Sequence, residues 1–270
     1  MSLPAAVEII LAPNPSLMTG PGTNSYVITG AEGVCAVVDP GPLIEEHLER
    51  LAQAANGQAQ AILITHGHPD HVEGAARLRE MTGAPIYAWS REGSPDADRF
   101  LKDGEALVVG GRTIRALYTP GHRFDHLCFL LEDVGALFAG DLVAGVGTVV
   151  IAPPEGDLAA YMASLRRLLT LDPRVILPAH GPAITDPEAL LEQYIQHREE
   201  RERQVLSGLA AGRRTIEALV AQIYADVDPA LHPVAALSVH AHLLKLLHDG
   251  RVVNLSAPNS ETWALVDEAP

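Results

Sequence analysis

The sequence contains very little cysteine. Its 270 residues include only two, Cys35 and Cys128, and both lie within apolar runs. Two cysteines are too few for the disulfide framework of a small secreted domain, and free thiols in apolar surroundings are typically buried. We therefore expect both thiols to be buried and unpaired, and the chain to work in a reducing cytoplasm.

Long apolar runs and an excess of positive charge are also missing. No stretch of 18 or more apolar residues occurs, and the first residues lack the pattern of a signal peptide, so no membrane partner is predicted. The chain carries 19 Lys and Arg against 34 Asp and Glu, a net charge of −15, which argues against non-specific affinity for nucleic acid. What remains, with 47% hydrophobic residues, is typical of a globular enzyme with a sizeable core.

Short β-branched or apolar runs bounded by turn residues predict strands along most of the chain. They are SYVITG, VCAVVDPG, QAILITHG, PIYAWS, ALVVGG, TIRALYTPG, LCFLLEDVG, ALFAGD and RVILPAHG. Helical periodicity predicts helices over 44–55, 72–81 and 157–171, the last with Asp157 as its N-cap. Because many strands follow one another directly, a layered α/β or α+β domain is favoured over a doubly wound sheet.

The pattern changes near residue 186. A long charged helix is predicted up to Gly212, followed by a helix capped by Thr215, a third helix, and two short strands, RVVNL and TWALV, around the loop SAPNSE. Three helices followed by a β-ribbon resemble a winged helix-turn-helix module. We therefore predict two domains, 1–186 and 187–270.

Side chains that can bind a metal follow four of the predicted strands, each beside a glycine. They are His66, His68, Asp70 and His71 after QAILIT, His122 after RALYTPG, Asp141 after ALFAG, and His180 after RVILPA. If these strands share an edge, their ends can converge on one point. His66 and His68 project to the same side of an extended segment, whereas Asp70 and His71 fall where a helix begins. The cluster therefore divides into parts of two sites.

The segments THGHPDH, TPGH, AGD and PAHG, in this order, resemble the metallo-β-lactamase superfamily, over roughly residues 6–185. The resemblance implies an α+β fold, the αββα sandwich of two sheets with outer helices. It also implies two metal sites, in which His66, His68 and His122 hold one ion, Asp70, His71 and His180 hold the other, and Asp141 bridges them. Imidazole and carboxylate ligands suit Zn²⁺ first, with Fe or Mn as alternatives.

Two such ions would carry four positive charges, and Asp70, Asp141 and a bridging hydroxide would remove three of them. The site would keep about one positive charge and would favour an anionic or polarised substrate, with the hydroxide as nucleophile. Asp70 and Asp141 are thus the predicted catalytic residues. His126 and Asn24 are further candidates for contact with the ligands or the substrate; a hydrogen-bonded strand histidine and a turn residue are the alternatives.

The substrate is less well determined than the chemistry. The segments NPSLMTGPGTNSYVI and TPGHRFDHLCF resemble the lactamase-β-like protein 2 group, which implies cleavage of single-stranded RNA as a candidate activity. Hydrolysis of a small ester, lactone or thioester, as in glyoxalase-II-type enzymes, is the alternative, and a non-enzymatic winged-helix protein with a structural metal is a third. Residues 191–270 hold 7 Lys or Arg and 11 Asp or Glu, so sequence-specific DNA binding is not expected. The module could instead close over the active site or form a homodimer.

Overall fold

The computed structural model describes residues 3–255 and 261–268. The chain divides into two compact units. The first comprises Met1–Pro120, Asp125–Val149 and Leu168–Leu190, and the second comprises Gly121–Phe124, Val150–Arg167 and Leu191–Pro270. The second unit thus includes two segments that precede residue 187, and the single boundary between 186 and 187 stays a prediction.

The first unit is built on two β-sheets. Within the described residues, the first sheet has six strands in the order of the sequence: β1 (Val7–Leu11), β2 (Asn24–Thr29), β3 (Cys35–Val38), β4 (Ala59–Leu63), β5 (Ile86–Ala88) and β6 (Arg99–Phe100). The pairs β1–β2 and β2–β3 are antiparallel, and the strands from β3 to β6 run parallel. The predicted strands in this region are confirmed, and β1 and β6 are additional ones that the sequence patterns did not predict.

The second sheet has five strands in the described residues, in the order β11-β10-β9-β8-β7. The strands are β7 (Ala106–Val109), β8 (Arg112–Tyr118), β9 (Leu127–Leu131), β10 (Ala136–Gly140) and β11 (Val175–Pro178). β10 pairs with β11 in parallel, and both β8 and β10 are antiparallel to β9. The carboxyl ends of β8, β10 and β11 therefore lie at one edge of this sheet.

The two sheets face each other across the main core. Tyr26 and Val38 of the first sheet pack with Phe129, Phe138 and Leu177 of the second. The rings of Tyr26 and Phe138 meet edge to face with their centroids 5.1 Å apart, a favourable arrangement for two buried aromatic rings. This core fixes the two sheet edges relative to each other, and with them the loops that carry the polar residues.

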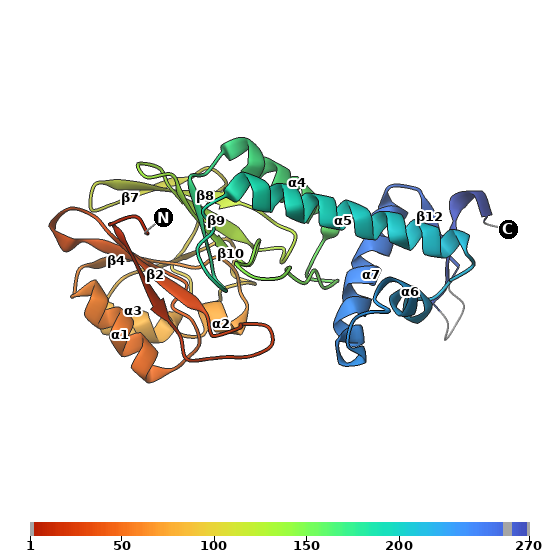
Figure 1. Ribbon diagram of the computed structural model, residues 1–270. Coiled ribbons are helices and arrows are strands. Elements are labelled where there is room, and N and C mark those ends of the chain that lie inside the picture. The colour runs from red at the N-terminus through yellow and green to blue at the C-terminus, as the bar shows by residue number, and fades with distance from the viewer. Residues whose placement is uncertain (1–2, 256–260, 269–270) are drawn as a thin grey trace. The chain divides into compact units, whose positions relative to one another are not determined.

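Helices cover the outer face of the first sheet (Figure 1). α1 (Glu45–Ala55) and α3 (Ala75–Thr82) bury Leu48, Leu51 and Leu78 against that sheet. The helix predicted over 72–81 is wrong in one respect, because the chain forms a short α2 (Pro69–Val72) and then α3. The break lies at Gly74, whose N–H donates to Gly41 O at 3.0 Å. A Cβ at Gly74 would lie only 2.6 Å from Leu48 Cδ2.

The second unit contains the predicted helices and the β-ribbon. Its elements are α4 (Leu158–Leu171) in its first part, α5 (Pro187–Ala210), α6 (Ile216–Ile223), α7 (His232–His248), β12 (Val252–Asn254) and β13 (Trp263–Leu265). Asp157 Oδ1 accepts from Ala160 N at 2.8 Å and Thr215 Oγ1 accepts from Ala218 N at 3.3 Å, which confirms both predicted helix caps. Most of the predicted loop SAPNSE, residues 256–260, lies outside the described residues.

The helix α7 lies in the core of this unit. Val239, Leu243 and Leu246 pack with residues of α5 and α6 and with Trp263. Among the described residues, the stretch Pro229–His248 is long and apolar enough to cross a membrane by length and composition alone. The core helix of a globular module has the same properties, and the buried contacts of α7 are of that kind.

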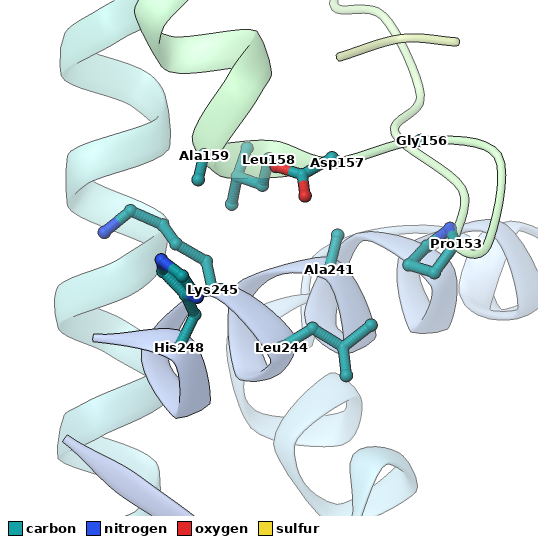
Figure 2. Close-up of a pocket in the computed structure, with 9 residues that line it drawn as sticks. All are labelled: Pro153, Gly156, Asp157, Leu158, Ala159, Ala241, Leu244, Lys245 and His248. Atoms are coloured by element: carbon teal, nitrogen blue, oxygen red, sulfur yellow. The ribbon is translucent and has the colours of Figure 1, made fainter. Parts of the chain in front are cut away.

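α7 also carries a buried histidine and lines a pocket. Burial, followed by neighbouring cationic groups, lowers the pKa of His242 to about 3. Those groups are Arg198, Lys245, His197 and Arg201. Figure 2 shows the pocket, in which Ala241 and Leu244 of α7 face Leu158 and Asp157 at the start of α4. Lys245 also lines it, and its Nζ lies 2.7 Å from both Glu202 Oε2 and Asp249 Oδ2, so acidic neighbours compensate its charge.

Candidate metal centre

The structure brings all seven predicted metal ligands together in two sets. His66, His68, His122 and Asp141 form one set, and Asp70, His71 and His180 form the other; in each, one ligand-type atom per residue lies within 4.8 Å of the others. The residues come from the loop and the short helix α2 that follow β4, and from the segments that follow β8, β10 and β11. The division of the HGHPDH segment between two sets agrees with the sequence prediction.

Four of the five histidines turn Nδ1 toward an oxygen acceptor. The distances are 3.0 Å from His66 Nδ1 to Thr65 Oγ1, 2.8 Å from His71 Nδ1 to Asp39 Oδ2, 2.9 Å from His122 Nδ1 to Val150 O, and 3.3 Å from His180 Nδ1 to Gly22 O. Since a carbonyl or carboxylate oxygen can only accept, Nδ1 of His71, His122 and His180 carries a proton, and Nε2 has a free lone pair when the ring is neutral, as it is in a metal-bound histidine. Histidines that bind metals are usually held in this way by a hydrogen bond from the other ring nitrogen.

The same tautomer follows for His66 through Thr65. The hydroxyl of Thr65 donates to Asp39 Oδ2 at 2.7 Å, so its oxygen accepts from His66 Nδ1. His66 Nε2 then faces His68 Nδ1 at 2.9 Å. Two nitrogens bound to one tetrahedral Zn²⁺ at about 2.0–2.1 Å would be separated by about 3.3 Å. The arrangement of His66 and His68 is therefore close to that of two ligands of one ion.

The Asp141 carboxylate lies between the two sets. Its Oδ1 is 3.6 Å from His71 Nε2 and 3.3 Å from His180 Nε2, and its Oδ2 is 4.0 Å from His66 Nε2. Asp70 Oδ2 lies 3.4 Å from His71 Nε2 and 3.3 Å from His180 Nε2. One carboxylate oxygen of Asp141 thus faces each set, which is the placement that a bridging ligand requires.

Charge in this cluster is strongly coupled. Burial by itself raises the pKa of Asp70 and of Asp141, but the facing imidazoles of His71 and His180 outweigh burial and hold both carboxyl pKa values well below their usual range. Burial lowers the pKa of His180, but Asp141 and Asp70 outweigh it and raise that pKa to about 9. The two carboxylates therefore stay ionised and require compensating positive charge, which a divalent cation also supplies.

Asp39 and Thr65 are parts of the centre that the sequence patterns missed. Asp39 is buried just after β3, and it accepts hydrogen bonds from Thr65 N at 2.8 Å, Thr65 Oγ1 and His71 Nδ1. It has a positive φ of 48°, which is uncommon for a residue other than glycine. The motif VVDPG contained the signal, because it places an acidic residue at the end of a predicted strand, as AGD does for Asp141.

Asn24 and its neighbour Thr23 hold the ligand loops. The side-chain amide of Asn24 donates to Pro178 O at 3.0 Å and to Gly181 O at 2.9 Å, on both sides of His180. Thr23 Oγ1 donates to Asp70 Oδ2 at 3.1 Å. The predicted proximity of Asn24 to the site is thus seen, as a contact with the backbone beside a ligand.

His126 contacts the backbone beneath Asp141. Its Nε2 accepts from Asp141 N at 3.2 Å, and its Nδ1 donates to Thr119 Oγ1 at 3.0 Å. The adjacent Asp125 accepts from Gly67 N at 2.9 Å, within the HGH segment. Both residues therefore fix the backbone of ligand loops, and a contact between His126 and the substrate stays a prediction.

Comparison with known proteins agrees with this geometry. Residues 18–180 match the profile of the metallo-beta-lactamase superfamily, and residues 215–263 match the beta-lactamase associated winged helix domain. The chain belongs to the metallo-β-lactamase superfamily. It is a metallo-hydrolase of that superfamily, with the α+β sandwich and the C-terminal winged helix that the sequence predicted.

Known relatives and solved structures align with most of this chain. The beta-lactamase-like protein 2 homolog of Caenorhabditis elegans is 36% identical over 96% of this chain and 88% of its own length. The atrochrysone carboxyl ACP thioesterase of Aspergillus fumigatus is 35% identical over 81% of this chain and 74% of its own. The crystal structure of a metallo-beta-lactamase family protein from Thermus thermophilus matches 98% of this chain and all of its own with a TM-score of 0.81, at 23% identity.

Proposed function

We propose that this metallo-hydrolase binds two divalent ions and hydrolyses an ester or a thioester. His66, His68 and His122 would hold one ion, Asp70, His71 and His180 the other, and Asp141 would bridge them. The observation that carries the proposal is the orientation of the histidines: His71, His122 and His180 each anchor Nδ1 on an oxygen and leave the Nε2 lone pair for a cation. A purely structural zinc site needs four ligands, whereas this cluster contains seven.

The ions would supply Lewis acidity and would lower the pKa of water to about 7, so that hydroxide is available at neutral pH. The protein's own part is to hold the ligands in fixed tautomers and to keep the carboxylates ionised. Asp39 fixes the tautomer of His71. His71 and His180 keep Asp70 and Asp141 ionised by lowering their pKa values. Imidazole and carboxylate ligands without thiolate suit zinc first, with iron or manganese as alternatives.

Two observations support an ester or thioester as the substrate. One relative, at 35% identity over 81% of the chain, is a thioesterase by name. The net charge of −15 does not favour a polyanionic substrate. Two buried free thiols support the cytoplasm as the compartment, because they would be kept reduced there.

Cleavage of single-stranded RNA is the second candidate. It is supported by similarity to the beta-lactamase-like protein 2 homolog over 96% of the chain, since the resemblance to that group implies an endoribonuclease. α7 itself offers little uncompensated positive charge to a nucleic acid, because its Lys245 is paired with Glu202 and Asp249. The same pairing leaves α7 poorly suited to reading double-stranded DNA.

One experiment separates the two candidates. Zinc-, iron- and manganese-loaded protein is incubated with a panel of thioesters, esters and lactones, and separately with a single-stranded RNA oligonucleotide. Asp141→Ala removes the proposed bridge, and Asp133→Ala, at an exposed aspartate paired with Arg112, is the matched control. We expect turnover of a thioester or ester that is lost in Asp141→Ala and kept in Asp133→Ala. RNA cleavage that depends on Asp141, with the small substrates left intact, would show the second candidate to be the correct one.

A further inference from the structure

A pocket of the first unit lies at the edge of the second sheet that is opposite the metal centre. Its apolar lining comes from five side chains: Leu3, Pro4, Val134, Val175 and Ala183. Val134 precedes β10 and Val175 begins β11, and these two strands run parallel. Asp141 and His180 follow the other ends of the same strands. The length of two strands therefore separates the pocket from the proposed metal ligands.

The floor of the pocket is a part of the main core that stays open to water. Val175 belongs to that core, and Leu3, Val134 and Ala183 pack against it while only partly buried. A hydrocarbon group in the pocket would remove this apolar surface from water. The volume of about 310 Å³ lies at the lower end of the range of about 300–1,000 Å³ for pockets that bind small molecules. The pocket therefore suits a small ligand with an apolar part.

Hydrogen bonds hold two walls of the pocket in place. Arg174 N donates to Gly135 O at 2.9 Å, which ties the turn before β10 to the start of β11. Ile184 N donates to Ile176 O at 2.8 Å, which ties the segment that carries Ala183 to the same strand. A ligand that enters between fixed walls loses less free energy to their ordering.

The polar side chains of the pocket are Asp133, Arg174 and Thr185, and their charges do not cancel. Asp133 forms an ion pair with Arg112, so its charge is compensated. Arg174 is exposed and has no ion pair with any carboxylate in residues 3–255 and 261–268. The start of its side chain lies on the turn, because a Cβ at Gly135 would be 3.0 Å from Arg174 Cγ. The pocket thus combines an apolar floor with one uncompensated cation.

We propose that this pocket binds a small aliphatic carboxylic acid in its ionised form. The hydrocarbon chain would lie on Leu3, Val134 and Val175, and the carboxylate would face the Arg174 guanidinium, whose planar fork of N–H donors matches a carboxylate. The site is additional to the proposed reaction and does not depend on it. An acid bound there leaves the metal centre open, since the two strands lie between them.

The first test compares ligands on the metal-loaded, full-length protein. Calorimetry measures the affinity of butyrate, hexanoate and octanoate, and of hexanol as a ligand with a chain but no charge. Hexanoate should bind about tenfold more tightly than butyrate, because two more methylene groups are buried. It should also bind about fivefold to tenfold more tightly than hexanol, since only the carboxylate engages a cation.

The second test uses variants of the pocket. Arg174→Met keeps most of the aliphatic stem and removes the charge, so hexanoate affinity should fall by about fivefold to tenfold while hexanol affinity stays unchanged. Ala183→Phe fills the pocket and should abolish the binding of both ligands. Arg91→Met is the matched control, because Arg91 is an exposed arginine on another loop, and it should keep both wild-type affinities.

Two results would overturn the proposal. One is equal affinity of wild type for the three acids. The other is hexanoate binding that both Arg174→Met and Ala183→Phe leave unchanged, which would place the carboxylate at the metal ions instead. If Ala183→Phe does not fold, Arg174→Met decides alone, since its side chain is exposed. Neither result bears on the proposed hydrolysis, which is tested by turnover, and absence of turnover leaves this measurement of binding intact.

Discussion

Asp39→Asn is the most informative change outside the ligands. The carboxylate of Asp39 accepts from Thr65 N at 2.8 Å, Thr65 Oγ1 at 2.7 Å and His71 Nδ1 at 2.8 Å. Asparagine keeps the size of the side chain but replaces one acceptor oxygen by an NH₂ group. Because all three partners are donors, that group must face a donor, or His71 must change its tautomer and direct a proton at the proposed ion.

The expected losses of metal affinity and of stability follow from these contacts. Loss of a hydrogen bond to a metal-ligating histidine typically costs about 10–100-fold in metal affinity or activity, or about 1.4–2.7 kcal/mol. A buried donor left without an acceptor costs about 1–3 kcal/mol of stability in addition. His71 belongs to the second ligand set, so that ion should weaken more than the first. The first set is affected indirectly, since Thr65 also accepts from His66.

The assay is a competition titration with a chelator of graded affinity, read by elemental analysis and by turnover. We expect Asp39→Asn to retain one ion at chelator concentrations at which wild type retains two. Asp133→Asn, at an exposed aspartate, should match wild type. A folded Asp39→Asn protein that keeps both ions with wild-type affinity would show that Asp39 does not set the tautomer of His71.

Three further predictions concern other contacts. His126→Phe leaves Asp141 N without its acceptor; we expect activity to fall by about 10–100-fold at saturating metal, and unchanged kcat would refute this role. Gly93→Ala would place a Cβ 1.6 Å from Asp125 Oδ2. We expect the free energy of unfolding, measured in urea, to fall by about 1–3 kcal/mol. An unchanged midpoint of urea unfolding would contradict this. The pKa of His242 is about 3 in the folded chain, so the unfolded chain binds more protons between pH 6.5 and 3, and stability falls as the pH falls. The free energy of unfolding should be about 2 kcal/mol lower at pH 5 than at pH 7.5. His242→Leu should remove this difference. An equal dependence of the free energy of unfolding on pH in both proteins would refute the role of His242.

The sequence predicted the ligands well because the local signals were strong. All seven lie in the HGHPDH segment or stand beside a glycine after a predicted strand, and the order of the motifs resembled one superfamily. Short β-branched or apolar runs bounded by turn residues also predicted nine strands of the two large sheets. The two strands that were missed, β1 and β6, flank the first sheet, and β6 has only two residues, Arg99 and Phe100. A pair of residues held by one neighbouring strand carries no periodicity to detect.

The contacts around the ligands were harder to predict for a physical reason. Asp39 and His71 are 32 residues apart, and Asn24 and Gly181 are 157 apart, so each contact depends on the register of the sheets. A single buried aspartate in VVDPG has the same local pattern whether it caps a turn or orients an imidazole. Only the parallel pairing of β3 with β4 places Asp39 beside Thr65. The ligand types therefore follow from the sequence, whereas their tautomers follow from the pairing of strands.

The same reasoning explains why the link between the loops 13–23 and 142–149 was not predicted. In the sequence, Leu17 and Met18 stand in a glycine-rich turn, and Val146 stands in another, with nothing to relate them. His180 relates them in the structure, because its imidazole donates to Gly22 O and its carbonyl accepts from Gly145 N. A residue proposed as a metal ligand is thus also the point that fixes both loops. Any change that displaces His180 should therefore alter the position of both loops together with metal affinity.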